Sequence, residues 1–234
     1  MQKKALGFIA LAFLAQSASF GTTCHAQAKA PYPAMAPLAQ YLMPDQNAEI
    51  ALARTAAPKS ISDAADVMVL TRNGYVTVRK GSNGFVCMVQ RGWSASTDFP
   101  EFWNPKLRAP ICFDPISAKT YMKLILMKTA LAIAGKPKAE ITQAVKSALD
   151  KKEILPTAPG AMSYMMSKEQ YLNDRAKMWH SHLMFLIPGQ VADNWGANLQ
   201  GSPVESQADP EERITFFYVL MDRWSDGTPA PKAH

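Results

Sequence analysis

Two histidines, His180 and His182, stand one residue apart in the stretch WHSHLMFLIP at 179–188. The other two histidines of the chain, His25 and His234, lie close to its ends. If the stretch forms a strand, alternate side chains share one face, so both imidazoles point the same way with β-carbons about 7 Å apart. Such a pair suits acid–base catalysis or the chelation of one divalent metal ion such as zinc. The alternative is a structural role in which both rings are neutral, one hydrogen-bonded in a pocket at the strand end and the other partly exposed.

A metal site at this pair would need a third ligand, and a carboxylate is the natural choice. Four acidic residues are candidates, and the sequence does not rank them: Asp174, Glu169, Asp114 and Glu101. For catalysis, we expect His180 and His182 to act together with Asp174 and Arg108. Three arginines could hold a substrate carboxylate or phosphate by paired hydrogen bonds, although solvated surface arginines are more common: Arg91, Arg108 and Arg223.

Methionines gather in the same part of the chain, namely Met162, Met165, Met166, Met178 and Met184. Thioethers are soft ligands, so these residues could form a copper(I) site with the histidines. Methionines more often fill irregular gaps in a core, and this is the interpretation that we favour.

The tryptophans are a further candidate for binding, because all five stand among glycine, serine, asparagine or arginine residues. They are Trp93, Trp103, Trp179, Trp195 and Trp224. They could line a cleft for a sugar or another small ligand. The alternative is that each lies at the rim of the core, where its indole N–H finds a hydrogen-bond partner.

The first 28 residues have the three parts of a secretory signal peptide. Two lysines follow Met1, an apolar stretch covers 5–15, and Ala26-Gln27-Ala28 matches a signal-peptidase site. We therefore expect cleavage before Lys29 and export to the periplasm or the medium. Residues 21–23 lack the context of a lipidation site, which disfavours a lipid on Cys24. The apolar stretch is also too short for a membrane span.

Cleavage would leave two cysteines, Cys87 and Cys112, in an oxidising compartment. We expect a disulfide between them, and a reactive thiolate at one of them is the alternative. Loss of Lys3 and Lys4 with the signal peptide lowers the formal charge from +6 to +4. No basic run exceeds two residues, so the sequence argues against nucleic acid as a partner.

The mature chain, 29–234, has the length and the apolar content of one domain. A proline-rich arm occupies 30–37, and a helix capped by Asp45 follows to about Ala56. Strand patterns at 67–70, 75–78 and 85–89 predict an antiparallel meander, whose first turn is Asn73-Gly74.

Prolines recur every five residues through 92–115, which predicts a long irregular loop that the disulfide would tie to the body. Helical periodicity follows at 117–134 and 137–152, and strand patterns at 162–166, 180–187 and 214–221 precede a loose C-terminal tail. The order of elements predicts an α+β fold, a largely antiparallel sheet with helices packed on one face.

Several short sequence words stand out: GFVC at 84–87, FWNPK at 102–106 with PICF at 110–113, WHSHLMF at 179–185 and RWSDGTP at 223–229. They resemble a family of exported bacterial proteins for which no activity is known. The resemblance spans most of the mature chain and implies export and a single domain. It implies no mechanism.

Standard motifs of serine hydrolases, zinc peptidases, thiol oxidoreductases and nucleotide-binding proteins are absent from the sequence. Two classes of function remain. We expect a small periplasmic hydrolase of ester, lactone or amide bonds, in which His180 and His182 work under the disulfide-tied loop. The alternative is a non-catalytic envelope protein that binds a small ligand or a metal, zinc or copper. The sequence leaves the oligomeric state open.

Overall fold

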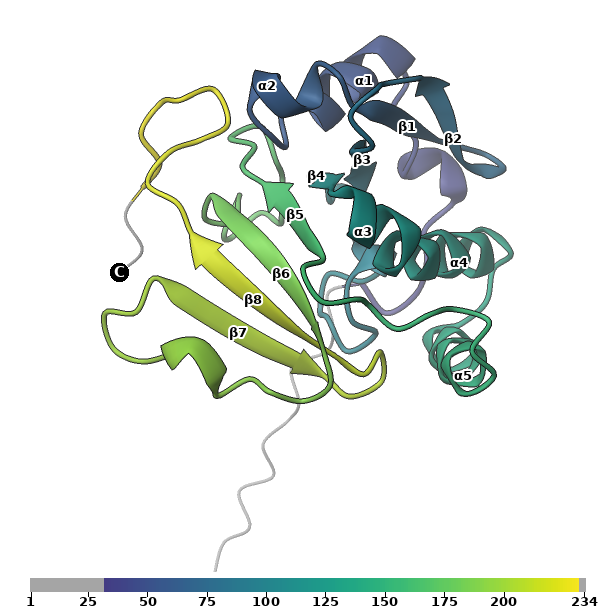
Figure 1. The fold of residues 1–234 in the computed structure, drawn as a ribbon. Coiled ribbons are helices and arrows are strands. Elements are labelled where there is room, and N and C mark those ends of the chain that lie inside the picture. Colours follow the sequence, from purple (N-terminus) through teal and green to yellow (C-terminus); the bar gives the residue numbers. More distant parts are fainter. Residues whose placement is uncertain (1–31, 232–234) are drawn as a thin grey trace, which may run out of the picture.

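The computed structural model describes residues 32–231 (Figure 1), so the expected signal peptide, Cys24, His25 and His234 lie outside the described residues. The strands are β1 (Asp66–Thr71), β2 (Gly74–Arg79), β3 (Val86–Gln90), β4 (Ala109–Phe113), β5 (Met162–Met165), β6 (His182–Pro188), β7 (Val204–Asp209) and β8 (Ile214–Leu220). They form one sheet in the order β2-β1-β3-β4-β5-β6-β8-β7. All but one pair of neighbours are antiparallel, which confirms the expected α+β class.

Five α-helices pack against this sheet: α1 (Gln46–Arg54), α2 (Lys59–Ser62), α3 (Pro115–Lys119), α4 (Tyr121–Ile133) and α5 (Lys138–Asp150). Short 3-10 turns cover Leu38–Gln40, Gly92–Ser94 and Asn194–Gly196. The stretch 117–134, expected as one helix, belongs to two, because the backbone leaves the helical region at Thr120. Within the described residues no helix combines the length and the apolar character that crossing a membrane requires.

The meander expected at 67–89 is half right. β1 and β2 form the antiparallel hairpin turned by Asn73-Gly74, but β3 pairs with β1 in parallel, on the side away from β2. After β2 the chain crosses the beginning of β1, where the amides of Ser82 and Asn83 donate to the carbonyl of Ala64. Gly81 permits this crossing, since a β-carbon there would lie 2.1 Å from the Ala64 oxygen.

The expectation of an irregular loop through 92–115 is wrong at its end, where β4 forms a buried strand of the sheet. β4 pairs with β3 along its whole length, and β5 joins it only at Cys112 and Phe113. Pro110 therefore lies where β4 lacks β5 beside it, which is where a sheet tolerates the missing amide of proline. The expected disulfide between Cys87 and Cys112 is present, but it joins directly opposed residues of two strands rather than tying down a loop.

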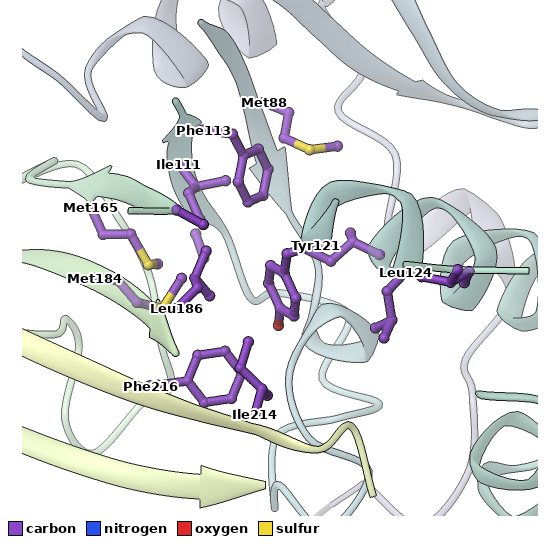
Figure 2. Close-up of a cluster of buried hydrophobic side chains, with 14 of the residues drawn as sticks. Met88, Ile111, Phe113, Tyr121, Leu124, Met165, Met184, Leu186, Ile214 and Phe216 are labelled. Carbon is purple, nitrogen blue, oxygen red and sulfur yellow. The ribbon is translucent and has the colours of Figure 1, made fainter. Parts of the chain in front are cut away.

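Side chains alternate along β3 and β4 between two cores. Cys87, Val89 and Cys112 pack under α1, while Met88 and Phe113 pack with the α4 residues on the opposite face. The helices after β4 thus share one face of the sheet, and α1 covers the other face at one end of it (Figure 1). Figure 2 shows the larger core, in which residues of β4, β5, β6 and β8 meet Tyr121 and Leu124 of α4.

The C-terminal half of the sheet, β5-β6-β8-β7, bears the candidate site. Strands near 162–166, 180–187 and 214–221 form as expected, whereas the edge strand β7 has no counterpart in the sequence-based prediction. After β8 the chain turns at Asp226-Gly227, and Trp224 within this turn is buried.

Candidate functional site

A cavity of about 440 Å³ lies on the face of β5, β6 and β8 that carries the larger core. Its floor comes from residues that the sheet register places side by side, because Met165 lies opposite His182 and Met184 lies opposite Tyr218. Its other walls come from residues 90–92, 94–96 and 178–180, from Phe99, Leu107, Ala109 and Tyr121, and from the exposed Glu205 and Gln207 of β7. The lining is largely apolar and aromatic, which is typical of a site for a small ligand.

His182 is the polar residue at the floor of this cavity, and its side chain is almost fully buried. Its Nδ1 lies 2.7 Å from the carbonyl oxygen of His180, while Nε2 has no hydrogen-bond partner among residues 32–231. The ring also packs edge-on against Tyr218, with ring centres 5.3 Å apart.

The surroundings of His182 define its protonation. Burial lowers the pKa of the imidazole to about 4, so the ring is neutral at neutral pH. A carbonyl oxygen can only accept, so the single ring proton belongs on Nδ1, and Nε2 keeps its lone pair. His182, a lining residue of the largely apolar cavity, therefore has an unprotonated, buried and unpartnered Nε2.

The structure brings the expected histidine pair to one cavity but gives its members different roles. β6 begins at His182, so His180 lies before the strand, and its side chain is exposed while also lining the cavity. Its backbone carbonyl fixes the ring of His182. The strand pattern placed both imidazoles on one face, and the structure contains one buried and one exposed, an arrangement that the structural alternative described.

Asp174 and Arg108 lie outside the cavity lining and are occupied elsewhere. The exposed Asp174 accepts a 2.5 Å hydrogen bond from the Tyr171 hydroxyl, which holds the pKa of this carboxyl below its usual value, and Lys106 lies 3.5 Å away. Arg108 donates to the carbonyls of Pro105 and Leu107, and burial lowers its pKa to about 10. Neither residue is placed to act with His182.

The other carboxylates considered as a third metal ligand also have other partners or positions. Asp114 caps α3, Glu101 accepts hydrogen bonds from Asn104 and Asn173, and Glu169 is exposed. Across 32–231 no group of three or more histidine, cysteine or acidic side chains lies close enough to hold a metal ion. The expected histidine–carboxylate site is thus not assembled in this structure.

The methionines divide between the cavity and its surroundings. Met165, Met178 and Met184 line the cavity, whereas Met162 and Met166 do not. Met165 and Met184 also belong to the large buried core (Figure 2). The favoured interpretation, that these residues fill a core, is therefore compatible with a place in the cavity wall.

The tryptophans and arginines do not assemble around the cavity as a group. Trp179 lines it, while the half-exposed Trp195 packs against Phe217 on the other face of the sheet. Arg91 reaches the lining, but its guanidinium donates to Glu49 and to backbone carbonyls, which leaves it a structural role.

A buried ion pair behind the cavity was missed by sequence reasoning. Lys128 of α4 and Glu212 bond to each other, and the ammonium also donates to the carbonyls of Ser94 and Ala95, which line the cavity. Burial raises the pKa of Glu212. The signal was available, because Lys128 follows Leu124 at four-residue spacing on the buried stripe of α4.

Comparison of the chain with models of protein families, with curated proteins and with solved structures finds no match. Function is therefore inferred from the cavity and its residues. Their arrangement offers a preformed, largely apolar space whose lining residues include two buried polar atoms without a partner in the described chain, Nε2 of His182 and Oγ of Ser94.

Proposed function

We propose that this chain is an exported, non-catalytic binding protein that takes a small ligand into the cavity through Nε2 of His182. The observation that carries this proposal is the buried imidazole nitrogen without a partner. A buried polar atom in this state costs about 1–3 kcal/mol, and a ligand that accepts its lone pair recovers that free energy. Hydrogen-bond donors and metal ions are the two kinds of ligand that can do so.

The neutral state of His182 favours binding over catalysis. A general base near neutral pH needs a pKa close to that pH, and burial lowers the pKa of His182 to about 4. The Nδ1 partner is a backbone carbonyl, which has no negative charge to stabilise an imidazolium during a proton transfer. The ring is thus suited to donate its lone pair and is a weak base.

Phenol and toluene are matched probes for this site, because they share a shape and differ in one O–H group. Phenol can donate to Nε2, and a hydrogen bond of about 1 kcal/mol makes its binding roughly 5-fold tighter. We expect both probes to raise the melting temperature of the protein, and phenol to raise it more. In His182→Phe the two probes should give equal shifts. Equal shifts in the wild-type protein would refute the proposal.

Export is part of this proposal and rests on the signal-peptide pattern at 1–28 and on the disulfide, which is characteristic of oxidising compartments. Intact-mass measurement of the protein recovered from the periplasm or the medium should give a chain that begins at Lys29. A chain that retains Met1, or a lipid on Cys24, would contradict it.

Hydrolysis of an ester, lactone or amide is the second candidate, and one observation favours it. Ser94 lines the same cavity, and its Oγ is buried without a hydrogen-bond partner among the described residues, as is Nε2 of His182. Chromogenic acetate and butyrate esters test this candidate. Turnover that disappears in both Ser94→Ala and His182→Phe would establish it, and turnover that persists in Ser94→Ala would exclude Ser94 as a nucleophile.

A further inference from the structure

Two thioethers and one imidazole lie together at the floor of the cavity. Met165 and His182 are directly opposed on the antiparallel strands β5 and β6, so their β-carbons are about 5 Å apart. Met184 follows His182 on the same face of β6, about 7 Å along the strand. Met165 and Met184 are diagonal neighbours, roughly 8 Å apart or less. All three residues line the cavity, and Figure 2 shows Met165 and Met184 on their neighbouring strands.

We propose that Met165, His182 and Met184 form a copper(I) site, with two thioether sulfurs and the Nε2 of His182 as ligands. The inference rests on the proposed function, because it names the ligand that occupies the lone pair of His182. It adds two protein ligands that the proposed function does not require.

His182 has the features of a metal-binding histidine. Ligating histidines commonly donate their second ring N–H to a carboxylate or a backbone carbonyl, which orients the ring and fixes the tautomer. The 2.7 Å contact from Nδ1 to the His180 carbonyl supplies that interaction. The same contact leaves Nε2 as the ring nitrogen that is free to bind a metal ion.

The chemistry of the donors selects copper(I) over zinc. Thioethers are soft ligands that suit copper(I), whereas zinc sites are built from thiolates, imidazoles and carboxylates. Zinc would also bring two positive charges into a largely apolar cavity whose three donors are neutral. Copper(I) brings one charge, which lowers the penalty for burial. Cys87 and Cys112, the cysteines within 32–231, are bonded to each other and cannot compete as thiolates.

Methionine side chains can adjust to bring their sulfurs to one ion. Each has three rotatable bonds, and these are the side chains that adapt most readily within a core. Met178, which is 40% exposed, also lines this cavity and is a further soft donor there.

Leucine substitutions separate the two methionines as ligands from their role as packing residues, because leucine and methionine have similar volumes. Met88→Leu is the matched control, since Met88 is buried in the same core cluster and does not line the cavity. The purified protein, with its disulfide intact, is titrated with copper(I) held by bathocuproine disulfonate under ascorbate. Silver(I) serves as a redox-inert second probe.

We expect the wild-type protein and Met88→Leu to remove one equivalent of copper(I) from the chelator. Met165→Leu, Met184→Leu and His182→Phe should each weaken binding by roughly 10-fold or more. Silver(I) should shift the methyl resonances of Met165 and Met184 and leave that of Met88 in place. A wild-type protein that takes no copper(I), or leucine variants that bind as the wild type does, would overturn the copper site.

The comparison of phenol with toluene distinguishes a failure of the copper(I) inference from a failure of the proposed function. If copper(I) does not bind and phenol still stabilises the protein more than toluene, the copper inference alone is wrong. If the advantage of phenol is also absent, the cavity does not use Nε2 of His182 and both proposals are wrong.

Discussion

Acid should destabilise this protein through His182 over a defined range of pH. The pKa of the ring is about 4 in the folded protein and about 6.5 in an unfolded chain. Between these values the unfolded chain binds a proton that the folded protein does not, so stability falls as the pH drops. The contribution is fully present above about pH 6.5 and is lost as the pH approaches 4. The difference of about 2.5 pH units corresponds to about 3 kcal/mol at 1.36 kcal/mol per unit.

His182→Phe isolates this effect, because phenylalanine keeps a ring against Tyr218 and removes the titration. Urea unfolding, followed by tryptophan fluorescence between about pH 4.5 and pH 7.5, gives the free energy of unfolding of each protein. The wild type should lose about 2–3 kcal/mol more than His182→Phe across this range. His180→Gln is the control and should keep the slope of the wild type, since it leaves the His180 carbonyl in place.

Parallel pH dependence in the wild type and in His182→Phe would refute this reasoning. A ring of His182 that titrates near pH 6.5 in the folded protein, identified by NMR through its absence in His182→Phe, would do the same. Either result would place the ring of His182 in contact with water. Nε2 would then have water as a hydrogen-bond partner, and the buried, unpartnered nitrogen on which the proposed function depends would be absent.

Three further predictions concern the remaining structure, each measured by urea unfolding. Lys128→Met should cost about 3–5 kcal/mol because it leaves Glu212 buried and unpaired, and Lys128→Met/Glu212→Gln should recover most of that loss. Replacing Cys87 and Cys112 by alanine should cost about 3.5 kcal/mol from the 25-residue separation, and equal stability would show that the bond adds nothing. Asp114→Ala should cost about 2 kcal/mol because its carboxylate caps α3, and an unchanged midpoint would contradict that role.

Turn residues and apolar periodicity predicted those elements whose formation depends on residues close together in the sequence. The Asn73-Gly74 turn predicted the hairpin of β1 and β2, and apolar periodicity predicted the main helices. β4 escaped prediction because Pro110 indicates a loop, and the absence of β5 beside that residue is visible only in the sheet. β7 escaped because an edge strand carries too little apolar alternation to be recognised. β3 lies on the side of β1 away from β2 because the chain crosses the beginning of β1 after β2. The apolar periodicity of the sequence gives no sign of that crossing.

The candidate site likewise combines features that the sequence predicted with features that depend on the tertiary fold. The apolar run after His182 predicted a strand, which the structure contains from His182 onward, and both histidines line one cavity. The carbonyl that fixes the ring of His182 depends on the conformation at the strand start, which the sequence does not specify. Closeness in sequence misled the choice of Asp174, which lies six residues before His180 and yet projects into solvent. Lys128 and Glu212, 84 residues apart, meet only through the tertiary fold.

The disulfide lies beneath α1, so the rate at which it is reduced reports how often that helix moves away from the sheet. Both sulfurs are buried, and the sulfur of Cys112 lies 4.0 Å from the carbonyl oxygen of Ala53 in α1. A reductant must reach a sulfur directly, so α1 has to lift before the bond can be cleaved. During folding the bond must likewise close before the helix seals it. The buried ion pair between Glu49 of α1 and Arg91 holds the helix against the sheet. The rate of reduction therefore also measures how often this ion pair breaks.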